Sequence, residues 1–209
     1  AHPHAGILRN IAQRSCHLLH DDSLHSLTAN PLFLTANPQL MNPVVSIIMG
    51  STSDLPIVSK AAAFLDTLEI PFEMHALSAH RTPRAVEEFA SQARDRGIKV
   101  IIAAAGMAAA LPGVIAALTS VPVIGVPIRS SLEGRDALLS IVQMPPGIPV
   151  ATVGIDGAQN AAILATQILA LCDPEVAKRL DLWRATLSDK IVKASRELSQ
   201  LRTYKYKTN

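Results

Sequence analysis

Aromatic residues are scarce in this chain of 209 residues, and its net charge is small. Aromatics make up 3% of it, and the net charge at pH 7 is only +2. Proteins that follow nucleic acid backbones need a larger positive surface, and proteins that bind single strands stack bases on aromatic rings. The composition therefore argues against a nucleic acid partner. With 49% hydrophobic and 17% charged residues, the chain favours a folded core over global disorder.

Cysteine is also rare. Cys16 and Cys172 are the two cysteines of the sequence. Two cysteines cannot build a disulfide scaffold or, by themselves, a zinc site. Cys172 also lacks the neighbouring residues that activate a nucleophile, so we interpret it as structural. The cysteine content favours a reduced, cytoplasmic setting.

The first forty residues differ from the rest. They hold five of the seven histidines, but the spacing of these histidines matches no zinc motif, and we predict no metal there. No apolar run follows a basic start, as it would in a secretory signal. We expect residues 1–40 to be an extension, flexible or non-native, with Met41 as the natural start of the folded domain.

One uncharged stretch, Val100–Ile128, is long enough to span a bilayer. It is rich in alanine, which is only weakly apolar, and prolines at 112 and 122 divide it into short pieces. A buried strand, a helix and a second strand explain it better than a membrane segment does. We therefore predict no membrane partner.

From Met41 on, short β-branched runs alternate with helical patterns. Strands are predicted over 44–49, 72–77, 99–103, 121–126 and 149–153, and helices over 54–68, 82–96, 107–118, 137–142, 158–171 and 174–202. This alternation is typical of a parallel sheet covered on both faces. We predict a three-layer α/β/α sandwich, a flavodoxin-like, doubly wound, five-stranded parallel sheet with a C-terminal helix. Residues 41–172 would be the catalytic domain, with 173–209 packing on it or on a neighbouring subunit.

Polar and small residues gather in the turns that follow the first three predicted strands. Parallel strands end at the same edge of the sheet, so these turns should meet there. Arg81 suits a phosphate group, and His80 beside it can carry a proton at neutral pH. This pair indicates proton transfer on a phosphorylated small molecule. Two plainer readings stay open: Ser53 and Asp54 could simply cap a helix, and His80 and Arg81 could be ordinary surface residues.

Four segments in order carry a resemblance to a known family: MGSTSD (49–54), SAHRTP (78–83), AGMAAALPG (105–113) and SIVQMPPGIPVATV (140–153). They resemble the class I 5-(carboxyamino)imidazole ribonucleotide mutases of purine biosynthesis, over residues 44–171. The resemblance implies an octamer with active sites between subunits, and no metal or organic cofactor. It implies transfer of a carboxylate from an exocyclic nitrogen to a ring carbon of a ribonucleotide. The enzyme that makes this substrate, 5-(carboxyamino)imidazole ribonucleotide synthase, is then a candidate for functional coupling.

The same resemblance implies roles for particular residues. His80 would be the catalytic proton shuttle, and Arg81 would bind the phosphate. The other substrate-binding residues would be Ser51, Ser53, Asp54, Ser78, Ala79, Ala105, Gly106 and Leu111.

The chain departs from the family pattern at three positions. Ala110 stands where the family has histidine, Met107 where glycine is usual, and Leu55 where tryptophan is usual. The change at Ala110 leaves open a weakly active or non-catalytic member. A carboxylase that uses free carbon dioxide is a further alternative, although that class usually carries lysine in the loop that contains Arg81.

Overall fold

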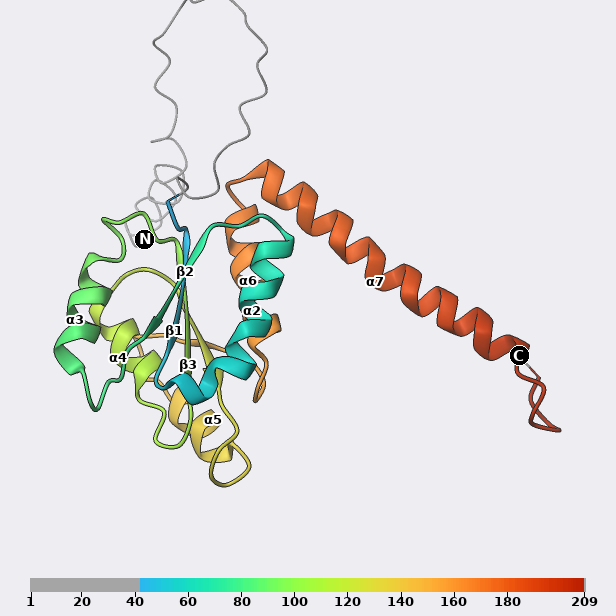
Figure 1. Ribbon diagram of the computed structural model, residues 1–209, viewed down its shortest axis with the longest axis horizontal. Coiled ribbons are helices and arrows are strands. Elements are labelled where there is room, and N and C mark those ends of the chain that lie inside the picture. Colours follow the sequence, from blue (N-terminus) through green and yellow to red (C-terminus); the bar gives the residue numbers. More distant parts are fainter. Residues whose placement is uncertain (1–41, 209) are drawn as a thin grey trace, which may run out of the picture. The chain divides into compact units, whose positions relative to one another are not determined.

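A computed structural model describes residues 42–208, and their centre is one parallel sheet of five strands (Figure 1). The strands are β1 (Val45–Met49), β2 (Phe72–Ala76), β3 (Val100–Ala105), β4 (Val123–Pro127) and β5 (Ala151–Thr152), in the order β2-β1-β3-β4-β5. The helices are η3 (Thr52–Asp54), α2 (Leu55–Thr67), α3 (Pro83–Gln92), α4 (Leu111–Leu118), α5 (Arg135–Val142), α6 (Ala158–Ala170) and α7 (Pro174–Gln200). This strand order confirms the predicted flavodoxin-like, doubly wound fold.

The two faces of the sheet have separate apolar cores. Side chains alternate along a strand, so Ile47 and Ile48 of β1 point to opposite faces, and both are fully buried. Ile47 packs with residues of α2, α6 and the start of α7, whereas Ile48 packs with residues of α3, α4 and α5. Figure 1 shows α2 and α6 on one side of the sheet, and α3 and α4 on the other. Both faces are covered, which explains why the three central strands β1, β3 and β4 are almost continuously apolar.

Three elements are shorter than the sequence pattern predicts. The helix expected from residue 107 begins at Leu111, because Met107 has a φ of +56° and cannot continue a right-handed helix. Helix α3 ends at Gln92 instead of 96, and turns lead on to Gly97. Strand β5 is reduced to two residues. The Val100–Ile128 stretch forms β3, α4 and β4 as predicted, and no helix within residues 42–208 could cross a membrane.

Helix α7 starts against the domain and then leaves it. The Asp173 carboxylate accepts hydrogen bonds from the backbone N–H groups of Glu175 and Val176, which caps the helix. Trp183 packs edge-to-face on Phe64 of α2, with ring centroids 4.9 Å apart. Farther along, apolar side chains of α7 are exposed, as at Ile191 with 71%. The predicted divisions at 40 and 172 stay predictions, and the extension 1–40 and Met41 lie outside the described residues.

Candidate functional site

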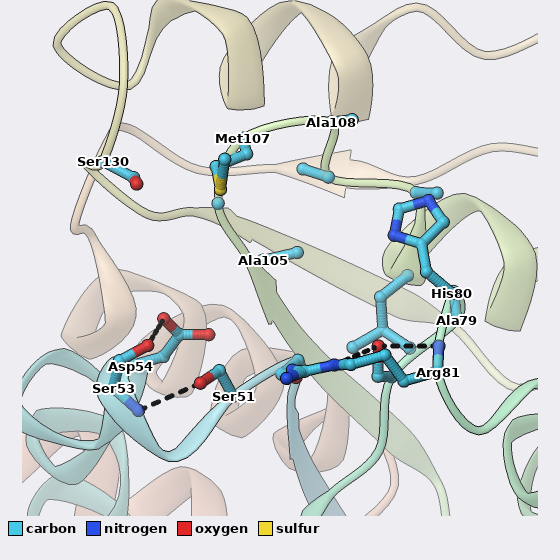
Figure 2. Close-up of a pocket in the computed structure, with 16 residues that line it drawn as sticks. Ser51, Ser53, Asp54, Ala79, His80, Arg81, Ala105, Met107, Ala108 and Ser130 are labelled. Atoms are coloured by element: carbon cyan, nitrogen blue, oxygen red, sulfur yellow. Dashed lines mark hydrogen bonds between the residues drawn. The ribbon is translucent and has the colours of Figure 1, made fainter.

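The carboxyl ends of β1, β2 and β3 meet at one edge of the sheet, and a pocket of about 500 Å³ opens there (Figure 2). It is lined by Gly50, Ser51, Ser53, Asp54, Ser78, Ala79, His80, Arg81, Ala105, Gly106, Met107, Ala108, Ala109, Ala110, Leu111 and Ser130. Every residue that the sequence analysis assigns to substrate or catalysis lies in this lining. The structure therefore brings the three predicted turns together, while the role of each residue stays a prediction.

The first loop, after β1, presents two hydroxyls and a carboxylate. Ser51 caps η3, its Oγ accepting a hydrogen bond of 3.3 Å from the backbone N–H of Ser53. The hydroxyl of Ser53 donates to Oδ1 of Asp54 at 3.2 Å. Asp54 stands at the N-cap position of α2 but makes no side-chain hydrogen bond to that helix. The reading that Asp54 simply caps a helix is therefore wrong, because its carboxylate does not serve the backbone there.

Asp54 is almost buried, with 7% of its surface exposed. Burial raises the pKa of this carboxyl group above its ordinary value, because the charged form loses hydration. Hydrogen bonds with Ser53 and Ser51 and the nearby charge of Arg81 act in the opposite direction and offset only part of this effect. A carboxyl group with a raised pKa at the wall of a pocket is typical of a functional site.

The second loop, after β2, is built around Arg81. Its Nη2 donates to the carbonyl oxygen of Gly50 at 2.7 Å, and its Nε donates to Oγ of Ser78 at 3.3 Å. Hydrogen bonds between Ser78 and Thr82 hold the ends of the loop together. The Nη1 group of Arg81 has no hydrogen-bond partner within residues 42–208. Arg81 is thus fixed in place with donor capacity left for an anion.

His80 lies on the same loop, at one end of the pocket (Figure 2). It is exposed, and neither ring nitrogen is hydrogen-bonded to another residue of the described part of the chain. Both nitrogens are therefore available to a bound molecule. A free imidazole next to a fixed guanidinium can exchange a proton with a ligand that the guanidinium orients.

The third loop, after β3, forms an apolar wall. Its lining residues, from Ala105 to Leu111, carry no polar side chain. Gly106 fits closely against the chain after β4: a Cβ atom there would lie 3.4 Å from the carbonyl oxygen of Ile128 and from Cβ of Ser130. The pocket therefore has a polar side, from the first two loops, and an apolar side.

The sequence analysis assigned no role in the pocket to Ser130, which comes from the loop after β4. A signal was present, since the turn after a fourth parallel strand ends at the same edge as the other three. Met107, Ala108, Ala109 and Ala110 also line the pocket without an assigned substrate role, because small and apolar side chains carry no chemical signature in a sequence.

Three further residues with titratable or reactive side chains lie outside the pocket. His75 in β2 lies with its Nε2 atom 3.3 Å from Oε2 of Glu73 and its ring against Phe89, which agrees with a structural role. Asp156 accepts hydrogen bonds from the backbone and side chain of Arg129, and so anchors the loop after β4. Cys172 is exposed. Within residues 42–208, no three histidine, cysteine or carboxylate side chains gather as metal ligands would.

The fold and the pocket together define a flavodoxin-like α/β protein with a small-molecule site at the carboxyl ends of its strands. Residues 44–190 match the family described as AIR carboxylase, and the chain belongs to this family.

Named relatives agree with this assignment. The chain is 62% identical to an N5-carboxyaminoimidazole ribonucleotide mutase of Pyrococcus abyssi, over 68% of this chain and 82% of the relative. The mutase of Bacillus subtilis is 53% identical, over 76% and 99% of the two chains. A phosphoribosylaminoimidazole carboxylase of Candida glabrata is 47% identical over 80% of this chain, but only 30% of that protein is covered. Among solved structures, Treponema denticola PurE superposes with a TM-score of 0.69 at 33% identity, covering 75% of this chain and 98% of that one.

Proposed function

We propose that this chain is a mutase of purine biosynthesis. It would convert 5-carboxyamino-1-(5-phospho-D-ribosyl)imidazole to 5-amino-1-(5-phospho-D-ribosyl)imidazole-4-carboxylate. Relatives named as mutases at 49–62% identity, covering most of both chains, support the activity. The observation that carries the proposal is the two-sided pocket, in which His80 and Arg81 share one loop and Arg81 is tied to the loop of Ser51 and Asp54.

The polar side of the pocket suits the phosphoribosyl part of the substrate. The free N–H groups of Arg81 and the hydroxyl of Ser51 would bind phosphate oxygens. The carboxylate of Asp54 would accept hydrogen bonds from ribose hydroxyls, with Ser53 holding it in place at 3.2 Å. Ser78 holds Arg81 through its Oγ atom, so its contribution is to orientation. The imidazole ring of the substrate would then lie between His80 and the apolar loop that contains Ala105, Gly106 and Leu111.

The reaction breaks one bond to carbon and forms another. The exocyclic N–C bond breaks, carbon dioxide leaves, and the electron pair stays on the nitrogen, which takes up a proton. The C4 atom of the ring then attacks carbon dioxide and loses its own proton. Among the described residues, His80 is the one histidine that lines the pocket, and neither of its ring nitrogens is hydrogen-bonded to another of these residues. We therefore assign to it the transfer of this proton from carbon to nitrogen.

Proximity supplies much of the rate. Holding carbon dioxide beside C4 makes the second step intramolecular, which is worth roughly 7–11 kcal/mol in well-oriented systems. Carbon dioxide has no hydrogen to donate. The apolar wall formed by the third loop gives it a surface without competing polar side chains. It also limits the access of water to the reacting atoms.

Two substrates test the proposal against a carboxylase. The purified chain is given the carboxyamino substrate without bicarbonate, and separately the aminoimidazole ribonucleotide with bicarbonate. A mutase forms product readily in the first assay, whereas a carboxylase does so only in the second. Product in neither assay would favour a non-catalytic member of the family.

His80→Asn tests the proton shuttle. We expect turnover to fall by about 10²–10⁴-fold, the usual contribution of a general acid or base, while ligand binding persists. His75→Asn is the matched control, because His75 lies outside the pocket and should leave turnover nearly unchanged. Near-normal turnover in the His80 variant would remove it from the catalytic role.

We further propose a homo-oligomer, an octamer by the resemblance, in which α7 reaches a neighbouring subunit. Val176, Leu180 and Trp183 continue along one stripe of α7 to Leu187 and Ile191 at helical spacing, and the last two are exposed in the single chain. Light scattering of the full chain tests this, and a monomer would contradict it. A cytoplasmic location and coupling to the synthase that supplies the substrate stay predictions of the sequence analysis.

A further inference from the structure

Met107 combines two features that folding does not require. Its φ of +56° lies in the left-handed region, which a residue with a side chain adopts at a cost. Of the described residues other than glycine with a positive φ, Met107 alone lines the pocket. Its apolar side chain is also 60% exposed and belongs to neither apolar core.

The neighbours of Met107 show that its backbone is held and not loose. On one side Gly106 lies close to Ile128 and Ser130 after β4, where a Cβ atom on the glycine would be 3.4 Å from atoms of both residues. On the other side Ala109 is buried in the core beneath α3, α4 and α5. The exposed methionine therefore sits between two fixed points, and the strained conformation is imposed by the loop that closes the pocket.

The left-handed backbone decides where the side chain points. Figure 2 shows Met107 at the rim, with its sulfur turned into the pocket, across from Ser51 and Asp54. A methionine side chain is unbranched and flexible, so it can fit against ligands of different shape without a fixed complementary surface. It adds bulk to a wall whose neighbouring side chains, Ala105 and Ala108, end at Cβ.

We propose that Met107 is a movable apolar cover over the pocket, which retains carbon dioxide between the two steps. This inference rests on the proposed function. Met107 transfers no proton and holds no charge, so it is a positioning residue. If carbon dioxide escapes before C4 attacks it, the products are the aminoimidazole ribonucleotide and free carbon dioxide. The cover therefore sets the ratio of transfer to escape.

The test follows the label of the transferred carboxyl group. Substrate with a ¹³C-carboxyl group is turned over in excess unlabelled bicarbonate, and the label retained in the product is measured after correction for spontaneous decarboxylation. We expect the chain to retain most of the label. Met107→Ala and Met107→Gly should each increase escape by at least about threefold, because both remove the side chain that excludes water.

Two comparisons separate the cover from general damage. Leu118→Ala removes an exposed apolar side chain of α4 that does not line the pocket, and it should leave label retention unchanged. Met107→Gly also relieves the left-handed backbone, so its Tm should be at least as high as that of Met107→Ala. Equal retention in the chain and in both Met107 variants overturns the inference while the mutase proposal stands. Complete loss of label already in the unmodified chain would mean that the product carboxylate comes from free carbon dioxide, and it overturns the mutase proposal together with the inference. A chain with no carboxylate transfer at all overturns the proposed function instead.

Discussion

The Nη2 atom of Arg81 donates a hydrogen bond of 2.7 Å to the carbonyl oxygen of Gly50. The backbone N–H of Gly50 in turn donates to the carbonyl oxygen of Ala104 in β3 at 3.1 Å. The ends of all three strands are therefore linked through one glycine. The side chain that we expect to bind phosphate is also the one that sets the spacing between the first and second loops.

Arg81→Lys should reduce kcat/KM by about 10- to 100-fold, which corresponds to one charge-assisted hydrogen bond of about 1.5–3 kcal/mol. Lysine keeps the charge but cannot contact Gly50, Ser78 and an anion at once. The mutase assay measures the effect. Arg84→Lys is the control, since Arg84 is exposed one turn farther along and does not line the pocket. An equal decrease of kcat/KM in the two variants would contradict a specific role for the hydrogen-bond geometry of Arg81.

Asp54→Asn should make the folded chain more stable at pH 7. Folding raises the pKa of the Asp54 carboxyl group through burial, so its charged form opposes folding. This cost is absent below the ordinary pKa of about 4 and grows as pH rises through the raised pKa. Denaturant unfolding at several pH values should show that the variant gains free energy of unfolding at pH 7 and that this gain disappears near pH 4. The mutase assay should show a reduced kcat/KM for the same variant. A variant that is less stable at pH 7 would contradict this account.

Glu73→Gln should make the folded chain less stable at pH 7, which is the opposite of the effect expected for Asp54→Asn. Burial alone would raise the pKa of Glu73, but hydrogen bonds from Ser46 and Arg96 at 2.5 Å and the ring of His75 lower it below its ordinary value. The charged form therefore stabilises the fold above the ordinary pKa of about 4, and this contribution is lost as pH falls through the lowered pKa.

We expect this variant to lose about 1–3 kcal/mol of its free energy of unfolding at pH 7, and to lose less in acid. Urea unfolding curves at several pH values measure the difference. Turnover at saturating substrate should persist, because Glu73 lies outside the pocket. A loss of stability that is independent of pH would assign the effect to packing instead of charge.

Ala110→His should raise turnover by at least about tenfold, which is less than the roughly 10²–10⁴-fold that a well-positioned acid or base contributes. Ala110 lines the pocket at the N-cap position of α4, so an imidazole there would face the space that His80 also faces. Ala110→Gln adds a polar side chain that cannot carry the proton, and it should give no such gain. Unchanged or lower turnover in the histidine variant would mean that no catalytic deficit exists at this position.

Several parts of the fold follow from local patterns. The apolar strands β1 and β3, which end at Met49 and Ala105, and the Thr82-Pro83 start of α3 were predicted close to their observed positions, because each has its own local signal. The start of α4 was not, since alanine and methionine favour helices and only the left-handed Met107 rules one out. The predicted range of β5 was too long, because the length of a strand at the edge of the sheet is limited by pairing with its neighbour and not by its own composition.

By itself, the order of short apolar strands and helical segments determined that this protein has a doubly wound parallel sheet, and that Ser51, His80 and Arg81 lie at one edge of it. Tertiary structure alone decided that Asp54 is buried without capping its helix, that Arg81 reaches Gly50, and that Ser130 and Met107 complete the pocket. The physical reason is that burial, long-range hydrogen bonds and an imposed left-handed backbone depend on which loops meet in space, and no local pattern encodes that meeting.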